Sequence, residues 1–163
     1  MSDYKELKEK LFYTQKNGLL KEDISAEVEE FSNGYKDFLG ASKTERLCVK
    51  KSIEILKKAG FIEFSYGKEY KAGDRVFINN RGKALAIAVI GQKTVDNGTR
   101  IAAAHIDSPR LDLKPNPLYE DSELALFKTH YYGGIKKYQW TAIPLALHGV
   151  IMKKDGTKTL FTL

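Results

Sequence analysis

The stretch Ala84-Leu-Ala-Ile-Ala-Val-Ile90, followed after a polar loop by Arg100-Ile-Ala-Ala-Ala-His-Ile-Asp-Ser-Pro109, decides the fold class of this 163-residue chain. Short, continuous apolar runs of this kind are typical of strands that are buried on both faces of a sheet. The residues before them have the composition of helices. Alternation of helices with buried strands predicts an α/β sandwich, with a polar cluster at the carboxyl end of a central strand.

Three helices are expected in the first sixty residues. The first runs from Ser2 to near Asn17-Gly18, and the second runs over residues 25–39 with Gly40 as its C-terminal cap. The third begins at Ser42, which has capping-box spacing to Glu45, and it stops at Gly60. The apolar residues of these helices recur at intervals of three and four, so we expect packing rather than catalysis from them.

Further strands are predicted on both sides of the deciding stretch. They cover residues 61–64, 75–78, 125–132, 144–153 and 158–163, with turns at 79–82 and at Asp155-Gly156. Lys114-Pro-Asn-Pro117 is interpreted as a rigid connector. A domain change is placed near residues 111–117, which divides the chain into residues 1–112, part of an α/β domain, and residues 113–163, the beginning of a β-rich domain.

Composition restricts the classes of function. The net charge of +6 would suit an acidic partner, but the lysines are spread among acidic residues, so no nucleic-acid partner is expected. No apolar run approaches the length of about 20 residues that crosses a bilayer, so no membrane partner is expected either. The single cysteine, Cys48, and the charged N-terminus favour a cytoplasmic protein, with Cys48 as a small buried residue.

His105 and Asp107 are the candidate site residues. They are two positions apart, so in a strand both side chains would point to the same side of the sheet, where they could converge on one ion. Imidazole and carboxylate are suitable zinc ligands. The residues alone leave two readings open: a zinc site, or a histidine at a strand end that is hydrogen-bonded to a carboxylate.

A longer block around this pair resembles a known family. His105-Ile-Asp-Ser-Pro109 and Leu-Asp-Leu-Lys-Pro-Asn-Pro117 are similar to a block of the aspartyl aminopeptidases, metallopeptidase family eighteen, in bacterial members of clostridial type. The lead-in from Gly60 to Gly91 is similar to the same family, and Tyr131-Tyr-Gly-Gly134 with residues 140–150 resembles the opening of its second, dimer-forming domain. The resemblance covers the chain as far as Asp155.

The resemblance implies a zinc aminopeptidase that releases N-terminal amino acids from peptides and assembles as a homo-oligomer through the second domain. It implies that His105 binds one of two zinc ions and that Asp107, the catalytic residue assigned here, orients that histidine or stabilises its charge. Such a carboxylate fixes the tautomer of the imidazole and raises its basicity. Zinc lowers the pKa of bound water and polarises the scissile carbonyl.

The family's other zinc ligands and its Glu-Glu pair are not recognisable after Asp107. Glu29-Glu30 is interpreted as solvated helix surface, His130 as a surface or interface residue, and His148 as a hydrogen-bonded core histidine. We therefore expect an N-terminal fragment that is inactive by itself. Two other hypotheses stay open: a non-catalytic module that dimerises or binds a partner, and a small basic nucleic-acid binder.

Overall fold

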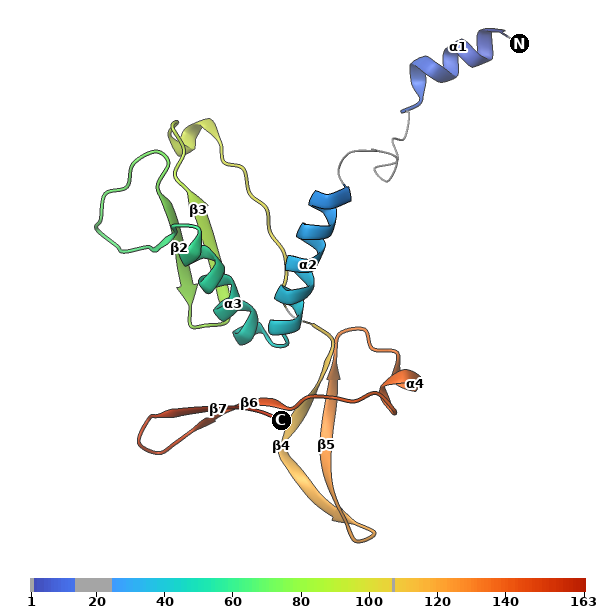
Figure 1. The fold of residues 1–163 in the computed structure, drawn as a ribbon, viewed down its shortest axis with the longest axis vertical. Helices are drawn as coiled ribbons and strands as arrows, with labels where there is room; N and C mark the ends of the chain where they lie inside the picture. Colours follow the sequence, from blue (N-terminus) through green and yellow to red (C-terminus); the bar gives the residue numbers. More distant parts are fainter. Residues whose placement is uncertain (1, 14–24, 107) are drawn as a thin grey trace. The chain divides into compact units, whose positions relative to one another are not determined.

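The computed structural model describes residues 2–13, 25–106 and 108–163 of the chain. These residues belong to two compact units, Met1–Asp37 and Phe38–Leu163. The first unit contains α1 (Ser2–Leu11) and most of α2 (Ser25–Ala41), whose last turn belongs to the second unit. All strands of the described residues belong to the second unit, which contains both candidate site residues (Figure 1). None of the described helices is long and apolar enough to cross a bilayer.

The second unit begins with α3 (Glu45–Lys58), which is followed by a three-stranded sheet. The strands are β1 (Ile62–Glu63), β2 (Arg75–Asn80) and β3 (Ala84–Val89), in the spatial order β1-β2-β3. β1 runs parallel to β2, whereas β2 and β3 form an antiparallel hairpin. Its turn has positive φ at Arg81 (56°) and at Gly82 (69°), the pattern of a type I′ turn, whose twist matches the twist of the strands.

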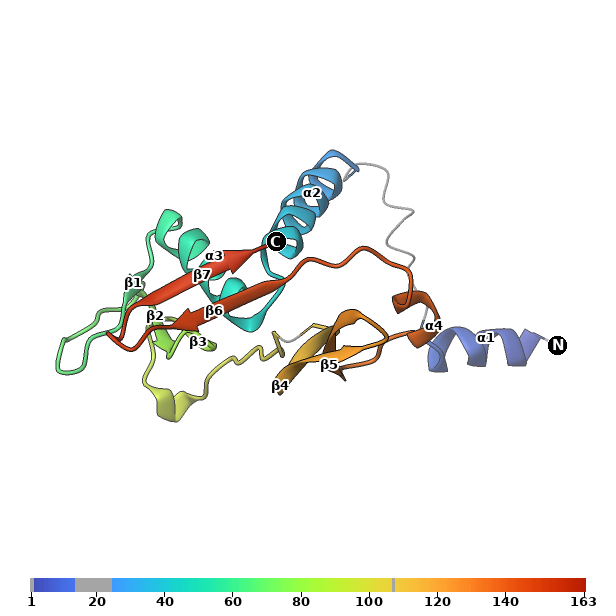
Figure 2. The ribbon, with the colours of Figure 1, turned by 90° about the horizontal axis from the view of Figure 1, so that it is seen from below.

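Two antiparallel ribbons complete the unit. After η2 (Val95–Asn97), β4 (Arg110–Asp121) pairs with β5 (Leu124–Tyr132). A short helix, α4 (Lys137–Trp140), leads to β6 (His148–Met152), which pairs with β7 (Lys158–Thr162) (Figure 2). Helices, a mixed sheet and ribbons in one chain confirm the predicted α/β class.

The core of the described residues lies in α3 and β2. Cys48, Val49 and Leu56 of α3 are buried together with Val76 and Phe77 of β2, and Phe77 is only 1% exposed. The prediction that Cys48 is a small buried residue is confirmed. Burial of these apolar side chains away from water is the main source of stability for this part of the unit.

Most predicted elements are confirmed, with three corrections. The capping prediction for α3 is wrong, because the N-cap is Thr44, whose hydroxyl accepts a hydrogen bond from the amide of Leu47 (3.3 Å). α2 continues through Gly40 to Ala41, so Gly40 is not its cap. The first helix was expected to end near Asn17-Gly18, but α1 ends at Leu11 and residues 12 and 13 are not helical; residues 14–24 lie outside the described residues.

Two strand predictions also differ from the structure. β3 was expected to be buried on both faces, but most of its side chains are exposed, because only β2 pairs with it among the described residues. Residues 100–104 were expected to form a strand, but residues 100–106 have no regular secondary structure. Both expectations came from apolar composition, which reports on the preference for burial and not on the presence of a neighbouring strand.

The predicted connector at Lys114–Pro117 is wrong, because these residues lie within β4. The pairing with β5 shifts register between Leu113 and Leu118, so the four residues between them have no direct partner in the ladder. Proline has no amide hydrogen to donate, and such an irregularity in the ladder is where a strand tolerates it. The domain change placed between residues 112 and 113 stays a prediction, and β4 runs through that position.

Candidate functional site

The two predicted site residues lie between η2 and β4. His105 is exposed and belongs to the irregular segment 101–106, and Asp107 lies outside the described residues. The same-side geometry expected of the pair is therefore not tested.

The chain after position 107 is held by several contacts to other elements. The Ser108 hydroxyl donates to the carbonyl oxygen of Lys43, at 3.5 Å, in the turn before α3. Pro109 lies against Gly133, whose positive φ (73°) favours glycine; a Cβ built there would lie 3.4 Å from the Cα of Pro109. Ser108 and Pro109 thus contact both the approach to α3 and the end of β5.

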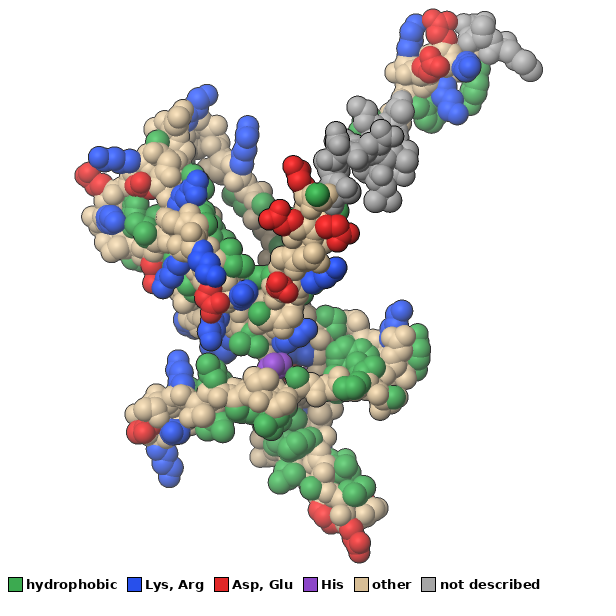
Figure 3. Space-filling view, viewed as in Figure 1, with side chains coloured by type: hydrophobic (Ala, Val, Ile, Leu, Met, Phe, Trp, Pro, Cys, Tyr) green, Lys and Arg blue, Asp and Glu red, His purple; other side chains and the backbone are tan. Residues whose placement is uncertain are grey.

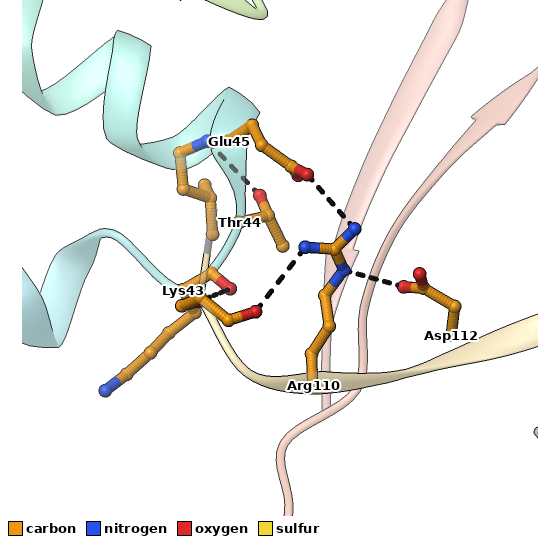
Figure 4. Close-up of polar contacts among 7 residues, drawn as sticks. Lys43, Thr44, Glu45, Arg110 and Asp112 are labelled. Atoms are coloured by element: carbon orange, nitrogen blue, oxygen red, sulfur yellow. Dashed lines mark hydrogen bonds and ion pairs between the residues drawn. The ribbon is translucent and has the colours of Figure 1, made fainter. Parts of the chain in front are cut away.

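Arg110, the first residue of β4, is the centre of a charged cluster (Figure 4). Its Nε donates to Oδ1 of Asp112 at 2.8 Å, and its Nη2 lies 3.1 Å from Oε1 of Glu45 at the start of α3. Nη1 donates to the carbonyl oxygen of Ser108 at 3.5 Å. The guanidinium carbon lies 4.2 Å from the ring centroid of Tyr132, the residue paired with Arg110 across the ribbon.

The charges of this cluster reinforce each other. The hydrogen bond to Asp112 raises the pKa of Arg110 above its ordinary value, partial burial opposes that change, and the negative charge of Glu45 adds to it. The Arg110 side chain is 22% exposed, so water screens these interactions less than on an open surface. Sequence reasoning missed the cluster, although Arg-x-Asp at the start of a strand places both side chains on one face.

The other two histidines form no hydrogen bond with Arg110, Glu45 or Asp112 in the described part of the chain. His148 of β6 is hydrogen-bonded as expected, with its Nδ1 3.1 Å from Oγ1 of Thr162 on β7, but it is half-buried and does not belong to the core of the described residues. His130 of β5 is exposed and stacks on Tyr131, with the ring centroids 5.5 Å apart. The expected surface position of His130 is therefore observed.

A cavity of about 850 Å³ lies beside the charged cluster. Its polar lining comes from the start of α3, the start of β4 and the β6–β7 ribbon, and includes Glu45, Arg110 and His148. His105 is not among the residues that line it. We therefore do not identify this cavity with the site predicted at His105.

Zinc needs three or four ligands from the protein. No group of three or more His, Cys, Asp and Glu side chains that could hold a metal is present within residues 2–13, 25–106 and 108–163. His105 is exposed and carries suitable chemistry for one ligand. The described residues thus fit a contribution to a zinc site and do not form a complete one.

Comparison with known proteins agrees with the family resemblance that was drawn from the block around His105. Residues 38–162 match the family model described as aminopeptidase I zinc metalloprotease (M18). The chain is 54% identical over 135 residues to a probable M18 family aminopeptidase 1 of Clostridium acetobutylicum, a match that covers 80% of this chain and 29% of the relative. The chain spans about three tenths of the length of the curated relatives it matches.

Solved structures of M18 aminopeptidases are also similar to this chain. An M18 family aminopeptidase from Thermotoga maritima superposes with a TM-score of 0.82 at 43% identity, covering 93% of this chain and 33% of that one. Aminopeptidase I from Borrelia burgdorferi B31 superposes with a TM-score of 0.82 at 40% identity, covering 90% of this chain and 37% of that one.

Proposed function

Because this chain belongs to the M18 family of zinc metalloproteases, we propose that it is the N-terminal part of an aminopeptidase that hydrolyses the first peptide bond of a peptide. The observation that supports this proposal is the position of His105. It lies inside the matched region, is exposed, and is followed by residues that are tied to α3 and to β5.

We assign His105 as a ligand of zinc, and Asp107 as the carboxylate that orients its imidazole. An imidazole binds zinc through one nitrogen, and a carboxylate at the other nitrogen fixes the tautomer. When bound, zinc would supply a Lewis acid and an activated water. Further ligands, for one zinc ion or for the pair that the family resemblance implies, would come from outside the described residues.

Two related predictions remain part of this proposal. Assembly into a homo-oligomer through residues 113–163 is supported by the exposed apolar side chains of the β4–β5 and β6–β7 ribbons (Figure 3). A cytoplasmic location is supported by the single, buried cysteine.

The histidines provide an internal test of the metal assignment. The experiment is a zinc titration of the 163-residue chain. It is monitored by NMR through the carbon-bound imidazole protons of its three histidines. We expect the His105 resonance to respond at the lowest zinc concentration, and a chelator to reverse the change. His130, which is also exposed, is the matched control. A first response at His130 or His148 would contradict the assignment of His105.

Activity is tested in parallel on aminoacyl chromogenic substrates with added zinc. Turnover that depends on zinc, is lost in His105→Ala and persists in His130→Ala would support the catalytic role of His105. It would also contradict the expectation that this chain is inactive by itself. Zinc binding at His105 without turnover would support the ligand assignment, and would place the remaining catalytic groups elsewhere.

A further inference from the structure

The β4–β5 ribbon shares no apolar core with α3 in the described part of the chain. The buried residues belong to α3 and β2, and none of the described residues of β4, β5, β6 and β7 is buried. The start of α3, the start of β4 and the β6–β7 ribbon instead line the cavity of about 850 Å³. A contact outside the core is therefore needed to fix the β4–β5 ribbon relative to α3.

The ion pair between Arg110 and Glu45 provides such a contact. Arg110 is the first residue of β4 and Glu45 is the first residue of α3, and Nη2 of the arginine lies 3.1 Å from Oε1 of the glutamate (Figure 4). The two side chains are 22% and 33% exposed, so both charges are partly shielded from water. Partial shielding strengthens the attraction between them.

The guanidinium is fixed within its own ribbon. Its Nε donates to Oδ1 of Asp112 at 2.8 Å, and its carbon lies 4.2 Å from the ring centroid of Tyr132, the residue paired with Arg110 on β5. The planar guanidinium presents its donors as a fork, so Nη2 can bond a third group while Nε bonds Asp112. The head group therefore moves with the ribbon, and its bond to Glu45 restricts the ribbon and not only the side chain.

Glu45 is fixed on the helix side. The hydroxyl of Thr44, the N-cap of α3, accepts a hydrogen bond from the Leu47 amide, so the backbone at Glu45 is held in the first helical turn. The helix dipole favours a carboxylate at this position. An ion pair between two groups that are already held loses less side-chain entropy than a pair on an open surface.

We propose that the Arg110–Glu45 ion pair is a latch, a contact that holds the β4–β5 ribbon at one orientation to α3, and that breaking it lets the ribbon reorient. The latch requires neither zinc nor a peptide, so this inference goes beyond the proposed function. Its consequence for assembly does rest on the oligomer proposed for residues 113–163. A ribbon held at one orientation presents its exposed side chains to a second copy at one angle.

The test measures amide residual dipolar couplings of the 163-residue chain by NMR, without zinc, at a concentration at which the parent and its variants sediment alike. Elements that form one rigid body fit a single alignment tensor. Glu45→Ala and Arg110→Met break the ion pair from either side. Glu54→Ala is the matched control, because Glu54 lies on the same helix, is exposed, and forms no hydrogen bond or ion pair with the described residues.

We expect α3 and the β4–β5 ribbon of the parent chain to fit one tensor. In Glu45→Ala and in Arg110→Met the ribbon should need a second tensor of smaller magnitude, because it then samples several orientations. The double variant should resemble each single variant, since both substitutions remove the same contact. Glu54→Ala should behave like the parent. The couplings within α3 check folding in every variant, and Glu45→Ala alone carries the test if Arg110→Met is unfolded.

A parent chain that needs two tensors would overturn the inference, and so would a single tensor in Glu45→Ala. A released ribbon in Glu54→Ala would overturn it as well, because the loss of any negative charge on α3 would then be sufficient. Release in Arg110→Met only would assign the effect to contacts within the ribbon and would remove the role of Glu45. Neither zinc nor turnover enters this measurement, so a failed latch leaves the zinc assignment standing, and a failed zinc assignment leaves the latch.

Discussion

Gly149 of β6 lies directly across from Phe161 of β7, and the phenyl ring occupies the space that a side chain at Gly149 would fill. A Cβ built at Gly149 would overlap the ring of Phe161. Covering a strand glycine with an aromatic residue from the neighbouring strand protects the exposed backbone and fixes the register of the pair. The β6–β7 ribbon therefore depends on the absence of a side chain at one position.

Gly149→Ala should destabilise the ribbon by about 1 kcal/mol, the lower end of the cost of overpacking, because the half-buried ring can partly move aside. Amide exchange at Leu147 and Leu163, which bond to each other at 3.0 Å, measures the effect. Gly134→Ala is the control, since a Cβ there meets nothing within 4 Å. Equal exchange in both variants would show that Phe161 does not require the glycine.

Thr44→Ala should lower the stability of α3 by about 1 kcal/mol, because the amide of Leu47 loses its hydrogen-bond acceptor. Ser42→Ala is the matched control. The Ser42 hydroxyl is buried and has no hydrogen-bond partner among the described residues, so its removal should be neutral or slightly stabilising. Urea unfolding followed by circular dichroism measures both. A larger loss in Ser42→Ala would restore the capping box predicted from the sequence.

The capping error shows what local patterns can decide. Ser42 and Thr44 are both good N-cap residues, and the Ser-x-x-Glu spacing favoured the first. The Ser42 amide still donates to the carbonyl of Leu39 in α2 (3.2 Å), and Thr44 is the residue that caps α3. The stop at Gly60 and the turn at Asp155-Gly156 were predicted correctly because each glycine has a positive φ of 81°, a requirement that is local.

Longer-range features were predicted less well for the same reason. The segment 101–104 has the composition of a buried strand, but Ile101 is 84% exposed and no strand pairs with it in the described residues. The prolines at 115 and 117 suggested a break, but a register shift accommodates them within β4. Strand pairing depends on a neighbouring backbone, which the sequence of one strand does not specify.

The sequence predicted the family of the candidate site but not the charged cluster next to it. The family resemblance based on the His105–Pro117 block is confirmed by the family match and by 54% identity to a clostridial relative. The roles of His105 and Asp107 stay predictions. The charged cluster around Arg110 was not foreseen, because it joins residues 65 positions apart and only the Arg110–Asp112 contact is local.

Asp155 should make the β6–β7 turn sensitive to acid. Its Oδ1 accepts hydrogen bonds from the Thr157 hydroxyl at 2.6 Å and from the Thr157 amide at 2.9 Å. The hydroxyl, and next the amide, lower the pKa of Asp155 below its ordinary value of 3.8. The pKa is lower in the folded than in the unfolded chain, so the ionised group stabilises the turn above pH 3.8, and this is lost as the pH falls through the folded value.

The Thr157 amide resonance, followed between pH 6 and about pH 2, measures this titration. We expect a midpoint below 3.8. Asp155→Asn keeps an oxygen acceptor and should abolish the pH dependence while preserving the turn. A midpoint at or above 3.8 in the parent chain would mean that Thr157 does not favour the ionised form.

The edge of the three-stranded sheet should add to the self-association that we propose for the ribbons of residues 113–163. Among the described residues β3 pairs with β2 only, and its side chains Ile87 and Val89 are 52% and 60% exposed. An apolar strand with unpaired backbone groups is a template for pairing with a second chain, and an edge lysine opposes such pairing because its charge would have to be buried. Ile87→Lys should therefore weaken the association of the chain, with little change in the folded state.

Sedimentation velocity over a hundredfold range of concentration measures this association. Ile55→Lys is the control, because Ile55 is also an exposed apolar residue (46%) but lies on α3, where the backbone groups are already bonded within the helix. Association that is as strong in Ile87→Lys as in the parent chain would mean that the ribbons β4–β5 and β6–β7 carry it alone. An equal reduction by both substitutions would mean that net charge, and not the free edge of β3, controls association.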